Sequence, residues 1–363
     1  MLAPLVRARR RQWVLGGVVI LAGILVGGAI VEGIIAAALA QPRLLASSDG
    51  SVGNALALAR RYYFHRDRYI VQFLPECAAY DPEVTYTLRP GGRCTVANRE
   101  HTVEYAANRA GVRDEEAALA RPAVVVTGDS HAMGWGVAAA ESFPKVMQRD
   151  LDVVVLNAAM SSYGTARELA LLERLRPRDV RALVIQYCDN DFGENRHIID
   201  RGALDITPEA VYRSVVADHA RDTRYYPFKH LVSFLGMAGR AMPWRPPRRA
   251  RPDTSREQAR YFLEVLARHP ALIEGRAVVV LELRGHARND DRFTRAVTGL
   301  LAEPRFAGLR PWVTAIDVSA SLTAADYYVL DDHMRPAGHA KVAALIAAEL
   351  RRRGAVSGPA PGR

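Results

Sequence analysis

The 363-residue chain has only three cysteines, and only three of its 49 basic residues are lysine. With 49% hydrophobic and 24% charged residues, this composition excludes disulfide-framework, collagen-like and coiled-coil classes and is typical of globular domains. No glycine-rich phosphate-binding loop precedes a helix, and no Cys/His spacing fits zinc. The sequence therefore predicts no cofactor and no metal.

Acidic residues are fewer than basic ones, 39 against 49, but the excess of positive charge is concentrated in two segments. Residues 1–40 carry a net charge of +3 and residues 240–256 carry +5, out of +10 for the whole chain. A nucleic-acid-binding protein presents a basic patch or stripe on its domain. Since the remainder of the chain is nearly neutral, we expect no nucleic-acid partner.

Long apolar runs are lacking except near the N-terminus, where Trp13 to Ala40 is apolar apart from Glu32. This run exceeds the roughly 20 residues that a membrane helix needs. Four arginines precede it, which places the rest of the chain outside the cytoplasm. We expect a single-pass anchor in the cytoplasmic membrane with a periplasmic domain. A cleaved signal peptide ending at Ala38-Leu39-Ala40 is the alternative, although its apolar region is normally about 7–15 residues long.

Four segments follow from the changes in pattern along the chain. They are a cytoplasmic arm and anchor (1–40), an irregular β-containing lead-in (41–120), an α/β domain (121–355) with an insertion at 220–254, and a flexible tail (356–363). In the lead-in, Tyr69–Phe73 and Val84–Thr87 are β-like. Cys77 and Cys94 flank a Pro/Gly-rich turn, and both a disulfide and two separate thiols remain open.

Continuous apolar runs alternate with helical patterns beyond residue 120. This alternation is typical of a parallel sheet covered by helices on both faces, which predicts a three-layer α/β domain. The expected strands are 122–127, 152–156, 180–186, 278–283 and 312–318; the expected helices reach Glu141 and cover 166–175 and 336–352. The insertion contains the apolar run His230–Met242 and an arginine-rich tip at 243–249, which is either a solvated loop or a membrane-contacting hairpin.

Polar residues at the carboxyl ends of the expected strands are the candidates for chemistry, because ligands bind there in open α/β sheets. Gly128-Asp129-Ser130-His131 follows the first strand, and Ser130 at such a turn is suited to be an acyl-transfer nucleophile. A helix cap by Asp129 or Ser130 is the structural alternative. Gly164 follows the second strand, and Asn190-Asp191 follows the third.

The fifth strand leads to Asp331-Asp332-His333 and the last helix. A histidine beside carboxylates can serve as a general base. We expect His339 to be structural, His286 to be a weak candidate for a substrate contact, and Cys188 to be a small buried hydrophobe.

The order of serine, glycine, asparagine and histidine at successive strand ends resembles the SGNH (GDSL-type) hydrolase superfamily over residues 121–352. The resemblance implies a flavodoxin-like α/β/α fold, Ser130 as nucleophile and His333 as its base. It also implies an oxyanion hole formed by the N–H groups of Ser130 and Gly164 and the amide of Asn190.

Two positions depart from the family pattern. Cys188 replaces a common glycine, and Leu330 stands where the family's aspartate usually lies, three residues before the histidine. Asp331 is the better substitute and Asp332 the alternative; because their side chains leave in different directions, we expect only one to reach the ring. Asp129 and Asp191 are accessory candidates.

Three functions are compatible with these residues. The leading hypothesis is a membrane-anchored serine esterase that removes acyl groups, such as O-acetyl esters, from a small molecule or an envelope polysaccharide. The second is a polysaccharide O-acyltransferase with the same serine, since His131 after the serine is similar to some extracytoplasmic acyltransferase domains. The third is a non-catalytic glycan-binding envelope protein, favoured by Leu330 and the arginine-rich insertion.

Overall fold

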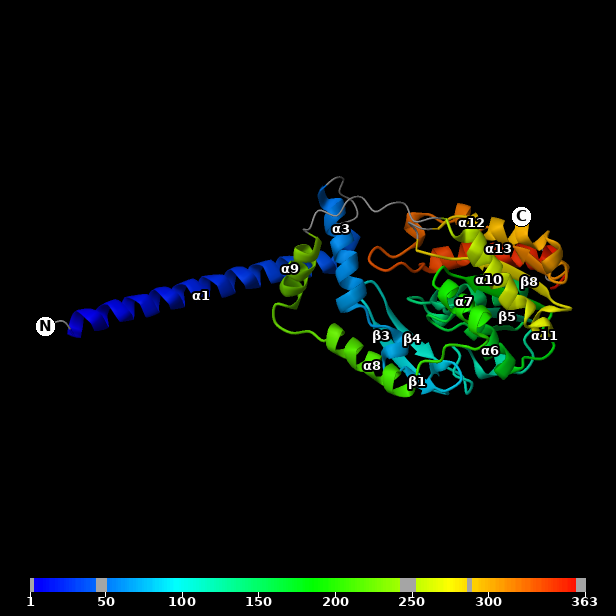
Figure 1. Cartoon of the computed structure of the whole chain (residues 1–363), viewed down its shortest axis with the longest axis horizontal. Helices are drawn as coiled ribbons and strands as arrows, with labels where there is room; N and C mark the ends of the chain where they lie inside the picture. Colours follow the sequence, from blue (N-terminus) through cyan, green and yellow to red (C-terminus); the bar gives the residue numbers. More distant parts are fainter. Residues whose placement is uncertain (1–2, 44–50, 242–252, 286–288, 357–363) are drawn as a thin grey trace. The chain divides into compact units, whose positions relative to one another are not determined.

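The computed structural model describes residues 3–43, 51–241, 253–285 and 289–356 (Figure 1). The chain forms two compact units. We name them the helical unit (Met1–Arg68 with Asp222–Arg249) and the sheet unit (Tyr69–Arg221 with Ala250–Arg363). These limits differ from the segments expected from the sequence, because residues 69–120 join the unit that contains the parallel sheet.

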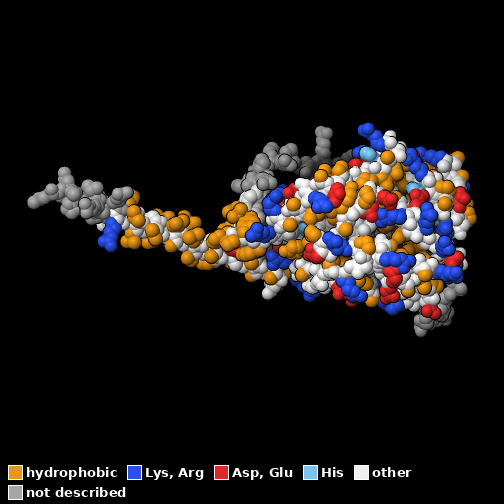
Figure 2. Space-filling view, turned by 90° about the horizontal axis from the view of Figure 1, so that it is seen from below, with side chains coloured by type: hydrophobic (Ala, Val, Ile, Leu, Met, Phe, Trp, Pro, Cys, Tyr) orange, Lys and Arg blue, Asp and Glu red, His pale blue; other side chains and the backbone are white. Residues whose placement is uncertain are grey.

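The helical unit begins with one long helix. Its helices are α1 (Ala3–Ala40), α3 (Ser51–Tyr62), the π-helix η1 (Tyr63–Asp67) and α9 (Lys229–Ala241). By length and composition, the Arg11–Ala40 part of α1 suffices to cross a membrane. Hydrophobic side chains cover most of the surface of α1 beyond Arg11 (Figure 2). The arginine-rich tip at 243–249 lies outside the described residues.

The sheet unit is built on a five-stranded parallel sheet of order β6-β5-β7-β8-β9. The strands are β5 (Val124–Thr127), β6 (Val155–Asn157), β7 (Ala182–Tyr187), β8 (Ala277–Glu282) and β9 (Val313–Ala315). Val124 pairs with Val155 on one side and Ala182 on the other, so the first strand lies inside the sheet. This flavodoxin-like order confirms the predicted fold.

Helices form two layers on the sheet. The chain moves in one direction from β5 to β6 and in the opposite direction from β6 to β7, so right-handed crossovers put their connecting helices on opposite faces. One layer holds α5 and α13, which pack together; in the other, α10 contacts α6, α7 and α12. These helices are α5 (Phe143–Leu151), α6 (Thr165–Leu175), α7 (Asp191–Arg201), α10 (Ser255–Ala267), α12 (Arg292–Leu301) and α13 (Pro336–Arg352).

The lead-in contains two antiparallel hairpins. β1 (Ala78–Asp81) pairs with β2 (Thr85–Leu88), and β3 (Arg93–Ala97) pairs with β4 (Thr102–Ala106). A disulfide joins Cys77 to Cys94, which settles the alternative left open by the sequence. The β-like interpretation of Tyr69–Phe73 is wrong: Val71–Phe73 is a 3-10 turn, in which Tyr212 donates a hydrogen bond to the carbonyl of Gln72.

Two other segments differ from the expected pattern. The helix after β5 is α4 (Ser130–Met133), one turn long rather than continuous to Glu141, because Gly134 adopts a left-handed conformation and ends it. Residues 139–141 then form a 3-10 turn. α8 (Glu209–Thr223) ends just inside the insertion at 220–254, and α9 covers its apolar run, so these parts of the insertion are helical rather than a loop.

Candidate active site

The turn after β5 presents Ser130 at the start of α4. Gly128 has φ +151°, and a Cβ atom there would lie 2.7 Å from Oε1 of Gln186 and 2.8 Å from Cβ of Ala132. Only glycine fits this position, because both the backbone conformation and the space exclude a side chain. The Gly-Asp-Ser motif therefore has a structural basis as well as a chemical one.

Two side chains satisfy the first N–H groups of α4. Asp129 accepts a hydrogen bond from His131 N at 2.9 Å, which makes Asp129 the helix cap. Oε1 of the fully buried Gln186, in β7, accepts from the N–H groups of Asp129 (3.1 Å) and Ala132 (3.2 Å). Within the described part of the chain, no group accepts from the N–H of Ser130. That donor remains free for an oxyanion.

A continuous hydrogen-bond chain joins Ser130 to the loop before α13. Oγ of Ser130 lies 2.6 Å from Nε2 of His333, and Nδ1 of His333 lies 2.5 Å from Oδ1 of Asp331. All three residues are buried, although they are separated by about 200 positions in sequence. This is the arrangement in which a serine hydroxyl loses its proton to a histidine that a carboxylate orients.

Asp332 also approaches the histidine, but the carboxylate hydrogen bond to the ring comes from Asp331, the residue that we expected to be the better substitute. Oδ1 of Asp332 lies 3.3 Å from Nδ1 of His333. Only Asp331 forms the short hydrogen bond, and its side chain is fully buried whereas that of Asp332 is one-third exposed. Asp331 and Asp332 directly precede His333, and the bend of the loop brings both carboxylates near the ring.

Aromatic rings fix the orientation of His333. The indole of Trp135 stacks on it with centroids 5.2 Å apart, and the indole N–H donates to Oδ2 of Asp331 at 3.1 Å. The ring of His131 lies 4.7 Å from that of His333. Burial and the neighbouring His333 lower the pKa of His131 to about 3. His131 is therefore neutral and adds no positive charge beside the base.

The β3–β4 hairpin supports the aspartate loop, a role that no motif in the sequence indicates. The carboxylate of Glu100, in the hairpin turn, accepts from three consecutive N–H groups: Val329 (2.8 Å), Leu330 (2.6 Å) and Asp331 (3.1 Å). The next residue, His101, places Nε2 3.8 Å from Oδ2 of Asp331. The hairpin thus holds Asp331 through its backbone N–H, and His101 lies close to its carboxylate.

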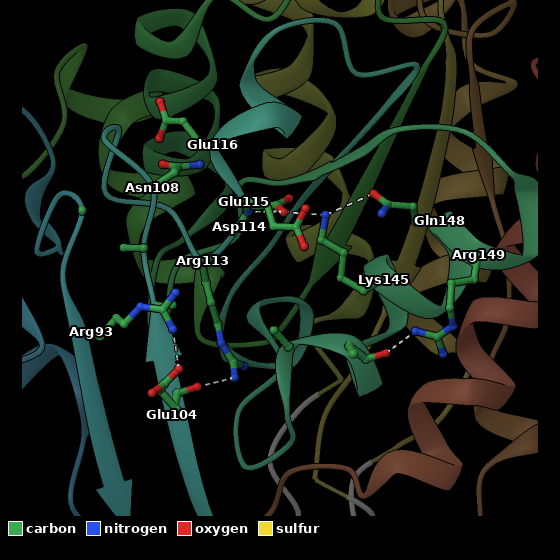
Figure 3. Close-up of a pocket in the computed structure, with 15 residues that line it drawn as sticks. Arg93, Glu104, Asn108, Arg113, Asp114, Glu115, Glu116, Lys145, Gln148 and Arg149 are labelled. Carbon is green, nitrogen blue, oxygen red and sulfur yellow. Dashed lines mark hydrogen bonds and ion pairs between the residues drawn. The ribbon is translucent and has the colours of Figure 1, made fainter.

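Arg113 ties the same hairpin to the nucleophile turn. This buried guanidinium donates to the carbonyls of Gly134 (2.5 Å), Val137 (2.9 Å) and, in β4, Glu104 (3.1 Å). Figure 3 shows Arg113 beside Glu104, at the wall of a pocket of about 710 Å³ with mixed charges. None of the predicted site residues lines this pocket.

The predicted oxyanion donors lie at the ends of the two strands that flank β5. Gly164 precedes α6, and Asn190, which is exposed, precedes α7. A Cβ atom at Gly164 would lie 3.0 Å from the side chain of Glu194, so the position requires a very small residue. The strands that precede Gly164 and Asn190, β6 and β7, lie on either side of β5, and neither residue hydrogen-bonds to Ser130 in the described residues.

Buried carboxyl groups lie behind this donor side. Asp191 accepts from the hydroxyl of Thr165 at 2.8 Å, which joins α7 to α6 and assigns Asp191 a structural contact. Neither carboxyl oxygen of the buried Glu168 has a hydrogen-bond partner among the described residues. Burial, reinforced by neighbouring acidic groups, raises the pKa values of Glu168 and Asp191 well above the usual range.

The remaining candidates have mainly structural environments. His339 is buried and accepts from Phe143 N at 3.2 Å, and burial lowers its pKa to about 3. Burial raises the pKa of the Cys188 thiol well above its usual value, so it is not a thiolate. His286 lies outside the described residues.

Asp331, Asp332 and His333 have potential metal-ligand atoms within 4.8 Å of one another. Both nitrogens of His333 already form hydrogen bonds, to Asp331 and Ser130. A metal ion at this group would displace at least one of them, which makes the residues better suited to proton transfer than to metal binding.

No protein-family model matches the chain, and no curated protein matches it. The chain is similar to the solved structure of TesA, with a TM-score of 0.37 and 13% identity, covering 63% of this chain and 98% of that one. A lipolytic protein of the G-D-S-L family from Desulfitobacterium hafniense DCB-2 gives a TM-score of 0.29 and 11% identity, covering 62% and 98%.

The acetyl xylan esterase Est2A from the rumen bacterium Butyrivibrio proteoclasticus gives a TM-score of 0.35 and 12% identity, covering 63% of each chain. These scores and identities are low. The function of the chain is therefore inferred from the geometry of its own residues.

Proposed function

We propose that the chain is a membrane-anchored, extracytoplasmic serine esterase of the SGNH type that cleaves acyl esters through an acyl-enzyme. The observation that carries this proposal is the unbroken hydrogen-bond chain from Ser130 through His333 to Asp331. A hydroxyl 2.6 Å from an imidazole nitrogen, with the other nitrogen held by a carboxylate, is the arrangement needed for an activated nucleophile.

In the proposed reaction, Nε2 of His333 removes the proton from Ser130 as Oγ attacks the ester carbonyl. The negative charge that forms on the carbonyl oxygen is stabilised by the N–H of Ser130 and by Gly164 and Asn190. His333 then returns the proton to the leaving alcohol, which leaves an acyl-serine. Water, activated by the same histidine, attacks the acyl-serine, releases the acid and restores the hydroxyl.

The anchor is the second part of the proposal. It is supported by the 30-residue apolar length of Arg11–Ala40, the exposure of its side chains and the arginines before it. An acylated envelope polysaccharide or small molecule is then the accessible substrate class.

An O-acyltransferase is the alternative, because the acyl-enzyme step is identical and only the acceptor differs. His131 directly after the serine favours it, and its ring lies beside that of His333. The non-catalytic alternative loses one of its two supports, because Asp331 supplies the carboxylate that Leu330 lacks.

The test is hydrolysis of a short-chain nitrophenyl ester by the full chain in detergent. Ser130→Ala should abolish hydrolysis, whereas Ser321→Ala, at an exposed serine, should not change it. Full activity in Ser130→Ala would refute the nucleophile assignment. Acyl transfer to an added oligosaccharide that exceeds hydrolysis would establish the acyltransferase instead.

A further inference from the structure

The α9 helix begins beside the only charged residue in the apolar part of α1 beyond Arg11. The Glu32 carboxylate accepts from Nδ1 of His230 (2.6 Å), from the N–H of His230 (3.2 Å) and from the N–H of Leu231 (2.7 Å). Glu32 is only 8% exposed. It therefore satisfies the first N–H groups of α9, where the positive end of the helix dipole favours a negative charge.

A glycine one turn earlier lets the two helices approach closely. A Cβ atom at Gly28 would lie 3.3 Å from Cε1 of Phe228 and 3.7 Å from Cδ2 of Leu231. Small residues have this role where helices pack in membranes. Gly28 and Glu32 thus form one contact surface on α1 for the start of α9, and Figure 1 shows α9 beside the carboxyl-terminal end of α1.

Polar and aromatic residues also contact the start of α9. Nζ of the buried Lys229 donates to the carbonyls of Arg66 (2.6 Å) and Thr223 (2.8 Å). The ring of Tyr62 lies 5.4 Å from His230 and 5.3 Å from Phe234. These contacts fix one side of α9 within the helical unit.

The opposite side of α9 is apolar and exposed. Val232 is 54% exposed and Leu235, three positions later, is 64% exposed. Residues three apart lie on the same face of a helix. An exposed apolar face needs a partner, and the position of α9 along α1 indicates which partner it has.

That position is the outer boundary of the proposed membrane span. Trp13 follows the arginines at the cytoplasmic end, and Glu32 comes nineteen residues later. At about 1.5 Å per residue this is about 28 Å, close to the roughly 30 Å thickness of the hydrocarbon core. A charged residue at that depth reaches the headgroup region, where amphipathic helices bury one apolar face.

We propose that α9 is an interfacial helix that lies in the outer leaflet, with Val232 and Leu235 in contact with lipid and its N-terminus fixed to α1 by Glu32. The inference rests on the proposed membrane span of α1 and deepens it. The chain is then held at the membrane surface by a second element, rather than by a single flexible tether.

The experiment uses the full chain in vesicles of phosphatidylethanolamine and phosphatidylglycerol, with nitroxide labels on single introduced cysteines in a Cys188→Ser background. Leu235→Cys reports α9, and Val211→Cys, at a 50% exposed residue of α8, is the matched control. For each label, we measure the ratio of its collision rate with oxygen, which enriches in lipid, to its collision rate with a water-soluble nickel chelate. We expect this ratio to be several-fold higher at 235 than at 211.

Ile24→Cys, in the middle of α1, tests the span separately. A label at 24 that is in water would refute the anchor, whereas a lipid-exposed 24 with a water-exposed 235 would refute only the interfacial helix. A label at 235 that is shielded from both reagents, with dipolar broadening between copies, would overturn the lipid assignment in favour of self-association.

Glu32→Ala tests the fixing contact in the same vesicles. We expect the oxygen-to-nickel collision ratio at 235 to fall toward that at 211, while the label at 24 stays in lipid. An unchanged ratio at 235 would overturn the role of Glu32.

Discussion

The two sides of Ser130 are built differently. On the base side, Leu330, Asp331 and His333 are buried, and their loop is held by the β3–β4 hairpin and by Trp135. On the donor side, Asn190 is exposed, and Gly164 packs against Glu194 rather than against the nucleophile. The base side is therefore already connected to Ser130 by hydrogen bonds, whereas Gly164 and Asn190 form no hydrogen bond to Ser130 among the described residues.

The base side depends on a loop that another element supports. The carboxylate lies two residues before the histidine, and a bent loop must satisfy its own N–H groups. Glu100 supplies the acceptor for three of them. The donor side is supported from α7, where Asn195 and Glu194 accept from the N–H groups of Ala166 and Arg167 at the start of α6.

The largest effect should come from breaking the base side. Asp331→Asn removes the charge that orients and stabilises protonated His333, and we expect kcat to fall by about 10³- to 10⁴-fold. Asp332→Asn should lower kcat less than about tenfold, because its carboxylate is 3.3 Å from the ring and partly exposed. Equal losses in both variants would contradict the assignment of Asp331.

Breaking the donor side should have the next largest effect. Asn190→Ala removes one oxyanion donor, which costs about 10²- to 10³-fold in kcat in such sites. Asp189→Asn, the neighbouring residue, is the matched control and should leave kcat within a few-fold. An unchanged kcat in Asn190→Ala would exclude this amide from the oxyanion hole.

Glu100→Gln tests the base side without changing a reacting group, because Glu100 hydrogen-bonds to the backbone of the loop that carries Asp331 and His333. Loss of charge-assisted hydrogen bonds to the loop should lower kcat about tenfold, corresponding to about 1.4 kcal/mol. KM should change little.

The pH profile distinguishes positioning from general destabilisation. Removing a negative charge beside the His333 loop lowers the proton affinity of the imidazole, so the acid limb of kcat/KM should move to lower pH. Glu104→Gln changes an exposed carboxylate of the same hairpin and should leave both kcat and the profile unchanged. An unshifted profile in Glu100→Gln would refute the positioning role.

The smallest effect concerns stability on the donor side. The raised pKa of Glu168 means that the unfolded chain loses this proton at a lower pH than the folded chain does. Stability therefore decreases as pH rises from about 4.5 toward the folded-state pKa.

Glu168→Gln should remove that decrease. Compared with the parent, it should melt a few degrees higher at pH 8, at about 2–4 °C per kcal/mol, and show no such gain at pH 4. Glu257→Gln, at an exposed position of α10, is the control. Equal melting shifts of Glu168→Gln at both pH values would contradict a protonated Glu168.

The sequence was sufficient to predict the strands of the parallel sheet and the polar residues that follow them. Apolar runs such as Val124–Thr127 and Ala182–Tyr187 are buried on both faces, and that requirement is visible in their composition. The proximity of Ser130 to His333 was also predictable, because both follow the carboxyl ends of parallel strands, which meet at one edge of the sheet. The turn at Gly128 lies at the same edge.

The supporting residues could not be predicted in this way. Glu100 and His101 lie in a hairpin whose relation to the loop at 329–331 is entirely tertiary, so no spacing or periodicity encodes it. Gln186 resembles any residue at the end of a strand until the fold places it under α4. One signal was available: Cys94 opens the hairpin that contains Glu100, and its disulfide marks that segment as fixed.

The central claim is that Ser130 is an activated nucleophile, and covalent labelling of the full chain tests it most directly. A fluorophosphonate should add once, at the peptide that contains Ser130, and labelling should be lost in Ser130→Ala and strongly slowed in His333→Ala. Absence of an adduct on the folded parent, or an adduct that persists in Ser130→Ala, would contradict the account.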